Sequence, residues 1–512
     1  MAVRDHVGIS IDKFNGLWRR GDIDTTPIDH FSESDNIDFI GNNSFGTRPG
    51  IAISQSVFVP LSNIKRIYNY PTQNANTLIV LAYNSLTGIG SIHHVVDPLT
   101  VYGPILSIQG MTDFAFVSYA GRGYISPFSN YVNGALTFQK GLANQFVYVY
   151  AGDGTPARKA AGSGMTGTMT IANGAAGFTD AGFKVFGIVT QTISGYNSPP
   201  TILTGFTTSA GNSVSFGNIP TSGDPNVVKR LLVSTITIPL FNGNLDGYQF
   251  FFVPNAVINN NTDTFLNNIS FYDAALLADA SALLQNYTSI PAGAVLSLYH
   301  NRLLVAATFT DISLVLVSQP GEPEAINQIS GLIVVPLDGN PITNAQELRD
   351  VLYVFKRAKT VAYADNGGDP SSWPIIPIDA ALGTSVHGIA TVLDSGAASV
   401  DFLIICTYQG INLFNGTYIT SMYNAPTNEL TWKIADLWSS LDRNQFGNIQ
   451  IINSPTHKRI YVVLPTRQLL VGNYSNGLDW KSIRWSPWSF RMGVNSIAIH
   501  NIDDIILGAD LI

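Results

Sequence analysis

Short apolar runs separated by turn residues recur along most of the chain. The runs are rich in Val, Ile, Tyr and Phe, and Asn, Gly, Pro or Asp interrupts them at intervals of roughly 8–12 residues. This spacing predicts short antiparallel strands that follow one another in a meander. Before position 150 the runs cover 51–59, 64–70, 78–83, 89–96, 114–119, 123–126, 135–139 and 146–150.

The same pattern returns in the second half of the chain. Residues 295–307, VLSLYHNRLLVAA, predict a hairpin that turns at His300 and Asn301. Further strand-like runs continue from 313 to 500. Repeated units of about four strands are typical of the blades of a β-propeller, and the chain length outside the central region allows six or seven blades.

Between these two parts the pattern changes. Residues 151–179 are dominated by Gly and Ala, and alternating apolar and polar positions follow, as in GFKVFGIVTQT at 182–192. About 100 residues of alternating strands joined by Gly and Pro turns predict a small β-sandwich of the immunoglobulin or fibronectin type III kind. We therefore expect an N-terminal arm (1–34), a first propeller part (35–157), an inserted sandwich (158–270), and a helix followed by the rest of the propeller (271–512).

Two helices are expected within this all-β chain. Residues 270–284 have Leu and Ala at helical spacing, and Ser270 or Asp273 can cap the first turn. In TNAQELRD, Thr343 and Gln346 have the spacing of a capping box, which predicts a short second helix.

The stretch DNIDFIGNNSFGTRPGI at 35–51 predicts one strand, a tight turn and the start of another strand. Because early strands of a propeller commonly complete the last blade, we expect this segment to join the two ends of the ring.

Charged residues make up 12% of the chain, hydrophobic residues make up 45%, and the net charge is -8. This composition excludes charge-driven disorder and disfavours a protein that binds nucleic acid by neutralising phosphates. A mildly acidic surface is compatible with DNA that moves past the protein without binding to it.

Cys406 is the single cysteine, so no intramolecular disulfide can form, and we expect its thiol to pack in the protein core. The sequence predicts that the protein is made in a cytoplasm and that it does not insert into a membrane.

Three groups of residues could in principle hold a ligand. Residues 162–167, GSGMTG, spell the dinucleotide pattern, but no apolar strand precedes them and no helix follows. His93 and His94 are adjacent, so on a strand they face opposite sides and cannot easily share a metal. Residues 365–369, DNGGD, offer oxygens to calcium, yet such clusters are also ordinary turns. We expect no cofactor and no metal site.

A glycosidase is the strongest enzymatic alternative, because two carboxylates suffice for that chemistry. Asp503 with Asp504 and Glu322 with Glu324 form such pairs in the sequence. Adjacent strand residues diverge, however, and the two glutamates flank a proline. SNGLDW at 475–480 is similar to the Asp-box of sialidases only in part, since its Asp and Gly stand in the wrong order. We expect no enzyme and no catalytic residue.

Several phrases together resemble β-propeller virion proteins of tailed phages, particularly tail hub or nozzle proteins of short-tailed phages. The phrases are DNIDFIGNNSFGTRPGI, FVYVYAGDGTPARKAAG, IPAGAVLSLYHNRLLVAA, VSQPGEPEAINQISGLIVVPLDGNPIT, ELRDVLYVFKRAKTVAY, SPTHKRIYVVLP and DWKSIRWSPWSF. The resemblance implies a homo-oligomeric ring, expected to be a hexamer, stacked below the portal and adaptor around the channel through which DNA leaves. It places the protein in the virion tail.

In the last of these phrases, Trp480, Trp485 and Trp488 are large apolar anchors, which we expect between adjacent blades. Two other functions stay open. The chain could be a receptor- or carbohydrate-binding baseplate or tail accessory protein, with sugars held on aromatic surfaces. Hydrolysis of cell-surface polysaccharide is a weaker alternative.

Overall fold

The computed structural model shows an all-β chain of many small antiparallel sheets, as the strand pattern predicts. It describes residues 36–40, 44–47, 62–72, 75–97, 100–133, 136–161, 165, 167–193, 197–224, 227–239, 248–278, 289–334, 338–376, 378, 383–392, 402–416, 429–500 and 504–509. No helix within these residues is long and apolar enough to cross a membrane.

Two sheets of the disc precede the central region in the described residues. The first runs in the order β3 (Ser62–Pro71), β4 (Asn76–Asn84), β5 (Ile89–Asp97) and β6 (Thr100–Gln109). The second contains β7 (Asp113–Tyr119), β8 (Arg122–Asn133), β9 (Leu136–Gly141), β10 (Tyr148–Tyr150) and β11 (Arg158–Lys159). Strand β8 pairs with β7, β9 and β10.

Five sheets follow the central region, and each of them is a simple meander. The first is β19 (Gly293–Tyr299), β20 (Arg302–Thr308), β21 (Leu314–Gln319) and β22 (Glu322–Ile333). The second is β23 (Ile342–Leu348), β24 (Val351–Lys356), β25 (Thr360–Tyr363) and β26 (Ile375–Ile376). The third is β27 (Ile389–Val392), β28 (Phe402–Cys406) and β29 (Ile411–Phe414).

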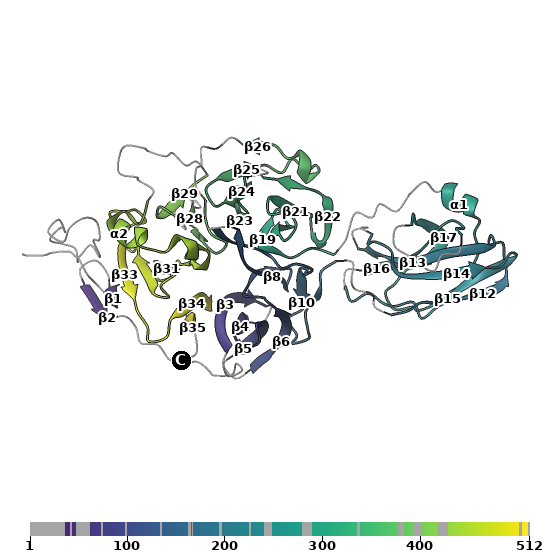
Figure 1. The fold of residues 1–512 in the computed structure, drawn as a ribbon, viewed down its shortest axis with the longest axis horizontal. Coiled ribbons are helices and arrows are strands. Elements are labelled where there is room, and N and C mark those ends of the chain that lie inside the picture. Colours follow the sequence, from purple (N-terminus) through teal and green to yellow (C-terminus); the bar gives the residue numbers. More distant parts are fainter. Residues whose placement is uncertain are drawn as a thin grey trace, which may run out of the picture.

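The last two sheets complete the disc. They are β30 (Gln450–Ser454), β31 (Arg459–Val463), β32 (Leu469–Asn473) and β33 (Arg484–Trp488), followed by β34 (Val494–His500) and β35 (Asp504–Ala509). Short helical turns interrupt the strand order: η2 (Pro370–Ser372) lies between β25 and β26, and η3 (Trp432–Ile434), α2 (Ala435–Ser439) and η4 (Arg443–Asn448) lie between β29 and β30. Figure 1 shows these sheets around a common centre, which supports the predicted β-propeller.

The central region forms two further sheets that lie to one side of the disc (Figure 1). One contains β12 (Thr170–Ala176), β15 (Asn212–Gly217) and β18 (Leu266–Ile269), and the other contains β14 (Thr201–Thr208), β13 (Gly182–Thr192), β16 (Val227–Ser234) and β17 (Phe251–Ile258). Phe186 and Leu232 of the second sheet pack against Val214 and Phe216 of the first in one buried core. Helix α1 (Asp273–Ala278) follows; of the predicted helix, residues 270–272 precede α1 without helical structure and residues 279–284 lie outside the described residues.

Adjacent sheets of the disc are held together by buried apolar clusters. Trp485 is fully buried and packs in one cluster with Ile404 of β28 and Ile451 of β30. Trp488 lies in the next cluster, with Val494 of β34. The predicted role of these two indoles between neighbouring sheets is confirmed. Trp480 instead packs edge-on against Trp432, with ring centroids 6.1 Å apart.

The predicted helix at 343–350 is wrong, because these residues form β23 and the turn that follows it. The positive φ angles of Arg349 and Asp350, 52° and 61°, allow a two-residue hairpin turn to β24. Pairing along both strands outweighs the local capping pattern. The predicted hairpin at 295–307 is confirmed, with His300 and Asn301 in the same kind of turn and Tyr299 paired with Arg302.

The N-terminal hairpin consists of β1 (Ile37–Ile40) and β2 (Ser44–Thr47), as predicted. It does not join the ends of the ring. The amide of Asn36 donates to the carbonyl oxygen of Pro487 (2.8 Å), so the hairpin lies beside β33. Instead, β34 contacts β3, where the side-chain Nδ2 of Asn495 donates to the carbonyl oxygen of Ile64 (3.1 Å). The predicted arm at 1–34 lies outside the described residues.

Candidate functional site: the axial cavity

A cavity of about 510 Å3 lies where the first strands of the disc sheets converge. Strands β3, β7, β19, β23, β27, β30 and β34 all contribute to its wall. Uncharged side chains line much of it, among them Asn69, Asn344, Gln346, Thr391 and Asn453. Such a wall can donate and accept hydrogen bonds without offering a fixed charge.

A buried ion pair lies at the base of this wall. Two nitrogens on one edge of the Arg66 guanidinium donate to the Asp113 carboxylate: Nε lies 3.0 Å from Oδ1 and Nη2 lies 2.6 Å from Oδ2. His387 Nε2 lies 3.1 Å from the same Oδ2, and the Tyr68 hydroxyl lies 3.2 Å from His387 Nδ1. The four side chains come from β3, β7 and the segment before β27, so they connect three parts of the disc.

The network continues to the last two sheets through Gln450. Arg66 Nη1 donates to Gln450 Oε1 (3.0 Å), and the Ser496 hydroxyl donates to the same oxygen (2.8 Å). Ser496 Oγ in turn accepts from the Ile67 amide (3.0 Å), and Gln450 Nε2 donates to the carbonyl oxygen of Ile497 (2.8 Å). First and last sheets are therefore joined by buried hydrogen bonds as well as by apolar packing.

Burial and charge act in opposite directions on the acid of this network. Burial alone would raise the pKa of Asp113, but the charges and hydrogen bonds of Arg66 and His387 outweigh burial and hold that pKa far below its usual range. Burial, followed by the nearby Arg66 charge, lowers the pKa of His387. Burial strongly raises the pKa of Tyr68. At neutral pH the network therefore contains a charged Arg–Asp pair next to a neutral imidazole and a neutral phenol.

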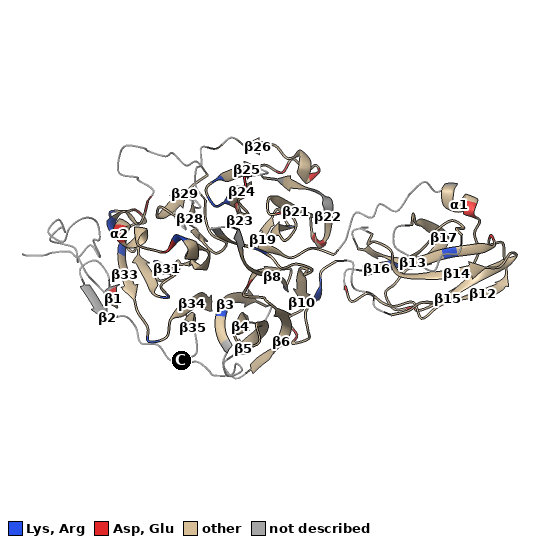
Figure 2. Cartoon of the chain, viewed as in Figure 1, with Lys and Arg blue, Asp and Glu red and all other residues tan. Residues whose placement is uncertain are grey.

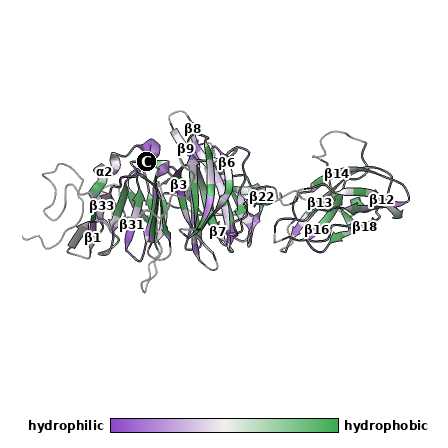
Figure 3. Cartoon of the chain, turned by 90° about the horizontal axis from the view of Figure 1, so that it is seen from below, coloured by the Kyte–Doolittle hydropathy of each residue, from purple (hydrophilic) through white to green (hydrophobic). Residues whose placement is uncertain are grey.

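The β8–β9 hairpin rises from one face of the disc (Figure 3). Gln139 of β9 donates through Nε2 to the carbonyl oxygen of Gly447 in η4 (3.0 Å), although these elements belong to sheets on different sides of the ring. Lys140 Nζ lies 3.8 Å from the ring centroid of Tyr131 in β8 and 4.0 Å from that of Phe309, which directly follows β20 of the neighbouring sheet. The hairpin therefore links the second sheet to the neighbouring sheet through Phe309 and to the distant turn η4 through Gly447.

The structure gives the two predicted histidines separate surroundings. His94 is buried, with Nδ1 2.7 Å from the Tyr150 hydroxyl and Nε2 2.9 Å from Thr77 Oγ1. Both ring nitrogens therefore have hydroxyl partners. His93 is the neighbouring residue on β5, and burial lowers the pKa of both histidines. The pair is not brought together around a common ligand position.

The predicted calcium candidate at 365–369 is arranged as consecutive turns. The amide of Gly367 donates to Asp365 Oδ1 (2.7 Å), and that of Gly368 donates to Asn366 Oδ1 (2.9 Å). Asp369 Oδ1 accepts from the Ser371 amide (3.0 Å). These carboxylate and amide oxygens cap backbone groups rather than converging on one point.

Neither pair of carboxylates that the sequence suggested for a glycosidase can be assigned to a catalytic site from the described residues. Glu324 is buried and binds Arg158 through both oxygens (2.6 and 2.7 Å), so this carboxylate has a structural partner. Glu322 is two residues away on the same strand, β22. Asp503 lies outside the described residues. In the 475–480 stretch, Asp479 Oδ1 accepts from the amide of Lys481 (2.8 Å), which makes it a turn residue.

Two further predicted positions can be placed. Cys406 is buried in β28, where burial strongly raises the pKa of its thiol, so the predicted packing role is confirmed. Most of 162–167 lies outside the described residues.

The residues of the axial network are absent from the sequence predictions. Arg66 and Gln450 are 384 positions apart, and Asp113 and His387 are 274 apart. No motif spacing connects them. Only the presence of an Arg within one apolar run, and of an Asp directly before another, could have drawn attention to them.

Comparisons with known proteins leave the family open. No family model matches the chain, and no curated protein matches it. Among solved structures, apo AztD from Citrobacter koseri has a TM-score of 0.31 at 11% identity, with 92% of this chain and 93% of that chain covered. Hsv2 from Kluyveromyces lactis has a TM-score of 0.25 at 11% identity, covering 83% and 98%. Sqt1 from Chaetomium thermophilum has a TM-score of 0.21 at 11% identity, covering 84% and 97%. Likenesses at these scores carry no functional argument.

Proposed function

We propose that the chain is a structural virion protein of a tailed phage, a tail hub or nozzle component that acts without catalysis. The observation that carries the proposal is the closed disc with a sandwich at its side, tied across its axis by the Arg66–Asp113–Gln450 network. A ring of small sheets leaves only short, protected sheet edges, which limits unwanted pairing between copies. The sequence phrases that resemble tail hub and nozzle proteins add the virion location.

In this proposal the disc is a seven-bladed propeller and the two side sheets are an inserted domain. Seven first strands line the axial cavity, which supports seven blades, the upper of the two numbers that the sequence allows. The side sheets fall within 170–269, inside the predicted limits of 158–270. Two antiparallel sheets around one apolar core support a β-sandwich of the immunoglobulin or fibronectin kind.

DNA would pass between copies of the protein and not through the axis of one disc. The axial cavity of about 510 Å3 is far too small for a duplex, and buried polar side chains cross its base. The conduit therefore requires a homo-oligomeric ring, expected to be a hexamer below the portal and adaptor. Figure 2 shows acidic and basic residues interspersed over the described chain, and the net charge of -8 suits a wall that does not retain DNA.

Mass spectrometry of purified particles tests the location, and native mass spectrometry of the isolated protein tests the ring. The expected result is the intact chain in particles at several copies per portal, with a closed oligomer at high protein concentration. Absence of the chain from washed particles would reject the proposal.

A receptor- or carbohydrate-binding role is the second candidate, and exposed aromatic rings at the junction of the inserted domain and helix α1 favour it. Phe178 and Tyr272 are each about half exposed (50%), and their ring centroids lie 5.1 Å apart. Exposed aromatic faces can stack on sugar rings. A glycan array probed with the wild type and with Tyr272→Ala tests this role. Saturable binding that the substitution removes would favour it, and the absence of any hit would count against it.

A further inference from the structure

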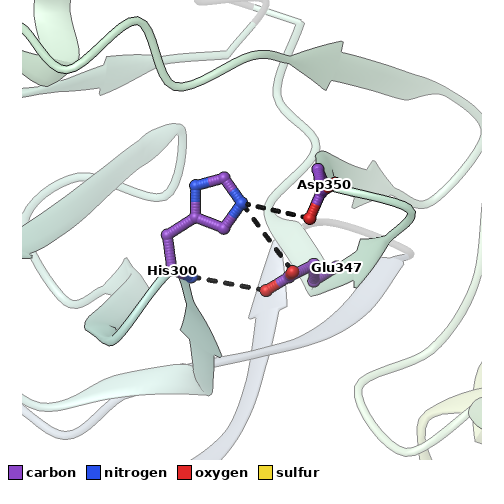
Figure 4. Close-up of side chains that lie close together, drawn as sticks. All are labelled: His300, Glu347 and Asp350. Carbon is purple, nitrogen blue, oxygen red and sulfur yellow. Dashed lines mark hydrogen bonds and ion pairs between the residues drawn. The ribbon is translucent and has the colours of Figure 1, made fainter.

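Two hairpin turns on neighbouring sheets bring an imidazole and two carboxylates together (Figure 4). His300, in the β19–β20 turn, has its Nε2 3.8 Å from Glu347 Oε1 and 3.7 Å from Asp350 Oδ1. Glu347 and Asp350 belong to the end of β23 and to the β23–β24 turn. One ring nitrogen of His300 and one carboxylate oxygen from each of the two acids all lie within 4.8 Å of one another.

The other side of the imidazole faces a third acid. His300 Nδ1 lies 3.8 Å from Asp365 Oδ2, and Asp365 is nearly buried. Arg302 Nε donates to that same oxygen (3.2 Å), which fixes the carboxylate. In metal sites, a carboxylate behind the ligating histidine commonly sets the tautomer that leaves the outward nitrogen free to bind.

The turns that carry these groups are rigidly connected. The buried hydroxyl of Tyr299 donates to the carbonyl oxygen of Asp350 (3.0 Å) and accepts from the Asp365 amide (3.1 Å). The Tyr299 ring also stacks on the His300 ring, with centroids 4.1 Å apart. Glu347 is oriented by the His300 amide, which donates to its second oxygen, Oε2 (3.3 Å). Glu347 Oε1 is thus left directed toward the imidazole.

We propose that His300, Glu347 and Asp350 bind one divalent cation of the zinc class, with Asp365 facing the imidazole from behind. Zinc takes nitrogen and carboxylate ligands at about 2.0–2.1 Å, so tetrahedral ligands lie roughly 3.3–3.4 Å apart. The observed 3.7 and 3.8 Å separations need only a small approach, which the 92% exposed Asp350 side chain can supply. Three carboxylates against the single Arg302 guanidinium also favour a cation. The proposal does not depend on the virion role.

The mixed ligand set argues for zinc over calcium or magnesium. Imidazole nitrogen is a preferred ligand of zinc, whereas calcium and magnesium take oxygen ligands and need more of them. The fourth position would hold water, since the turns are exposed. Such a site would clamp two adjacent sheets of the disc.

Isothermal titration calorimetry of the metal-free full-length protein with zinc chloride tests the site. The expected result is one zinc per chain for the wild type, at least a tenfold weaker affinity for Asp350→Asn, and loss of binding for His300→Ala. Asp365→Asn, which changes only the residue behind the imidazole, should weaken binding by about 10–100-fold. His457→Ala, which removes an imidazole from a different hairpin turn, is the matched control and should bind as the wild type does.

Asp350→Asn keeps the experiment decisive, because an almost fully exposed side chain can be changed without unfolding the protein. Absence of saturable zinc binding would overturn the proposal. So would equal affinity in the wild type, His300→Ala and Asp350→Asn, which would place the zinc elsewhere. If the substitutions changed only how the stability of the protein depends on salt, and not its zinc binding, the cluster would be an ion pair and the metal site would be rejected.

Discussion

Arg66 carries a positive charge in the interior of the disc, and its partners determine what that charge costs. Asp113 binds it through two hydrogen bonds, while Gln450 accepts a third. Removing a charge from water costs several kcal/mol, so a buried pair contributes to folding only when its hydrogen bonds are complete. The main effect of this pair is therefore to make any other arrangement of these sheets unfavourable.

Asp113→Asn should destabilise the protein by about 3–5 kcal/mol, because it leaves the buried Arg66 without its counter-charge. The double variant Arg66→Met, Asp113→Leu should lose much less stability than the sum of the losses in Arg66→Met and Asp113→Leu. Urea unfolding of the wild type, these two single variants and the double variant measures the coupling, and Asp442→Asn, at an exposed acid, is the control. A single variant as stable as the wild type would contradict the role given to the pair.

His387 should make stability fall as the pH is lowered. Its pKa is lowered in the folded state, so between about pH 6.5, its usual value, and the folded pKa the unfolded chain binds a proton that the folded chain does not. His93 and His94 act in the same direction. Asp113, whose folded pKa is also lowered, adds a second loss of stability below about pH 4.

The test is urea unfolding from pH 7.5 to 5.5 for the wild type and for His387→Gln. The variant should show a shallower slope, smaller by at most about 1.4 kcal/mol per pH unit, since one proton is involved. An identical slope in both proteins would show that His387 takes up its proton equally in the two states.

At the scale of the element, strand pairing could be predicted where alternating apolar residues flank a short turn in the sequence. The 295–307 hairpin has alternating apolar residues on both sides of a His–Asn turn, and it forms as expected. Thr343 and Gln346 gave a false helix, because the capping pattern is local whereas the pairing of β23 with β24 is decided by burial. The axial network could not be predicted, since its members meet only after the ring has closed.

The contact between Gly472 and Trp485 tests the packing between elements. A Cβ added to Gly472 would lie 2.6 Å from Cζ3 of the buried indole, so Gly472→Ala should destabilise by about 1–3 kcal/mol. In a Trp485→Phe background the effect of Gly472→Ala should be smaller, because the outer indole ring is gone. Thermal and urea unfolding of the four proteins provide the cycle, and full additivity would contradict the close packing.

At the scale of the whole molecule, Arg158 links the disc to the two side sheets of the central region, the proposed sandwich. Its Nη2 lies 2.6 Å from Glu324 of β22 and 3.5 Å from Asp224, which precedes β16 in the sandwich. The guanidinium is partly exposed, so its pair with Asp224 should be weak and sensitive to salt. The orientation of the sandwich thus depends on a contact that a partner or a change in ionic strength can release.

Asp224→Asn should broaden the range of sandwich orientations without changing the melting temperature of the disc by more than a degree or two. Small-angle X-ray scattering should show a larger maximum dimension for Asp224→Asn than for the wild type at low salt. High salt should produce the same increase in the wild type. Asp263→Asn, at an exposed acid of the same domain, is the control. Identical scattering of wild type and Asp224→Asn at low salt would show that other contacts fix the sandwich.

The virion role is tested most directly by a cryo-EM map of the tail of particles that contain the chain. The account predicts a closed ring of copies coaxial with the DNA channel, with each disc axis separate from that channel and blocked by its own polar network. Density for the chain only at the periphery of the tail, or DNA threading a single disc, would contradict it.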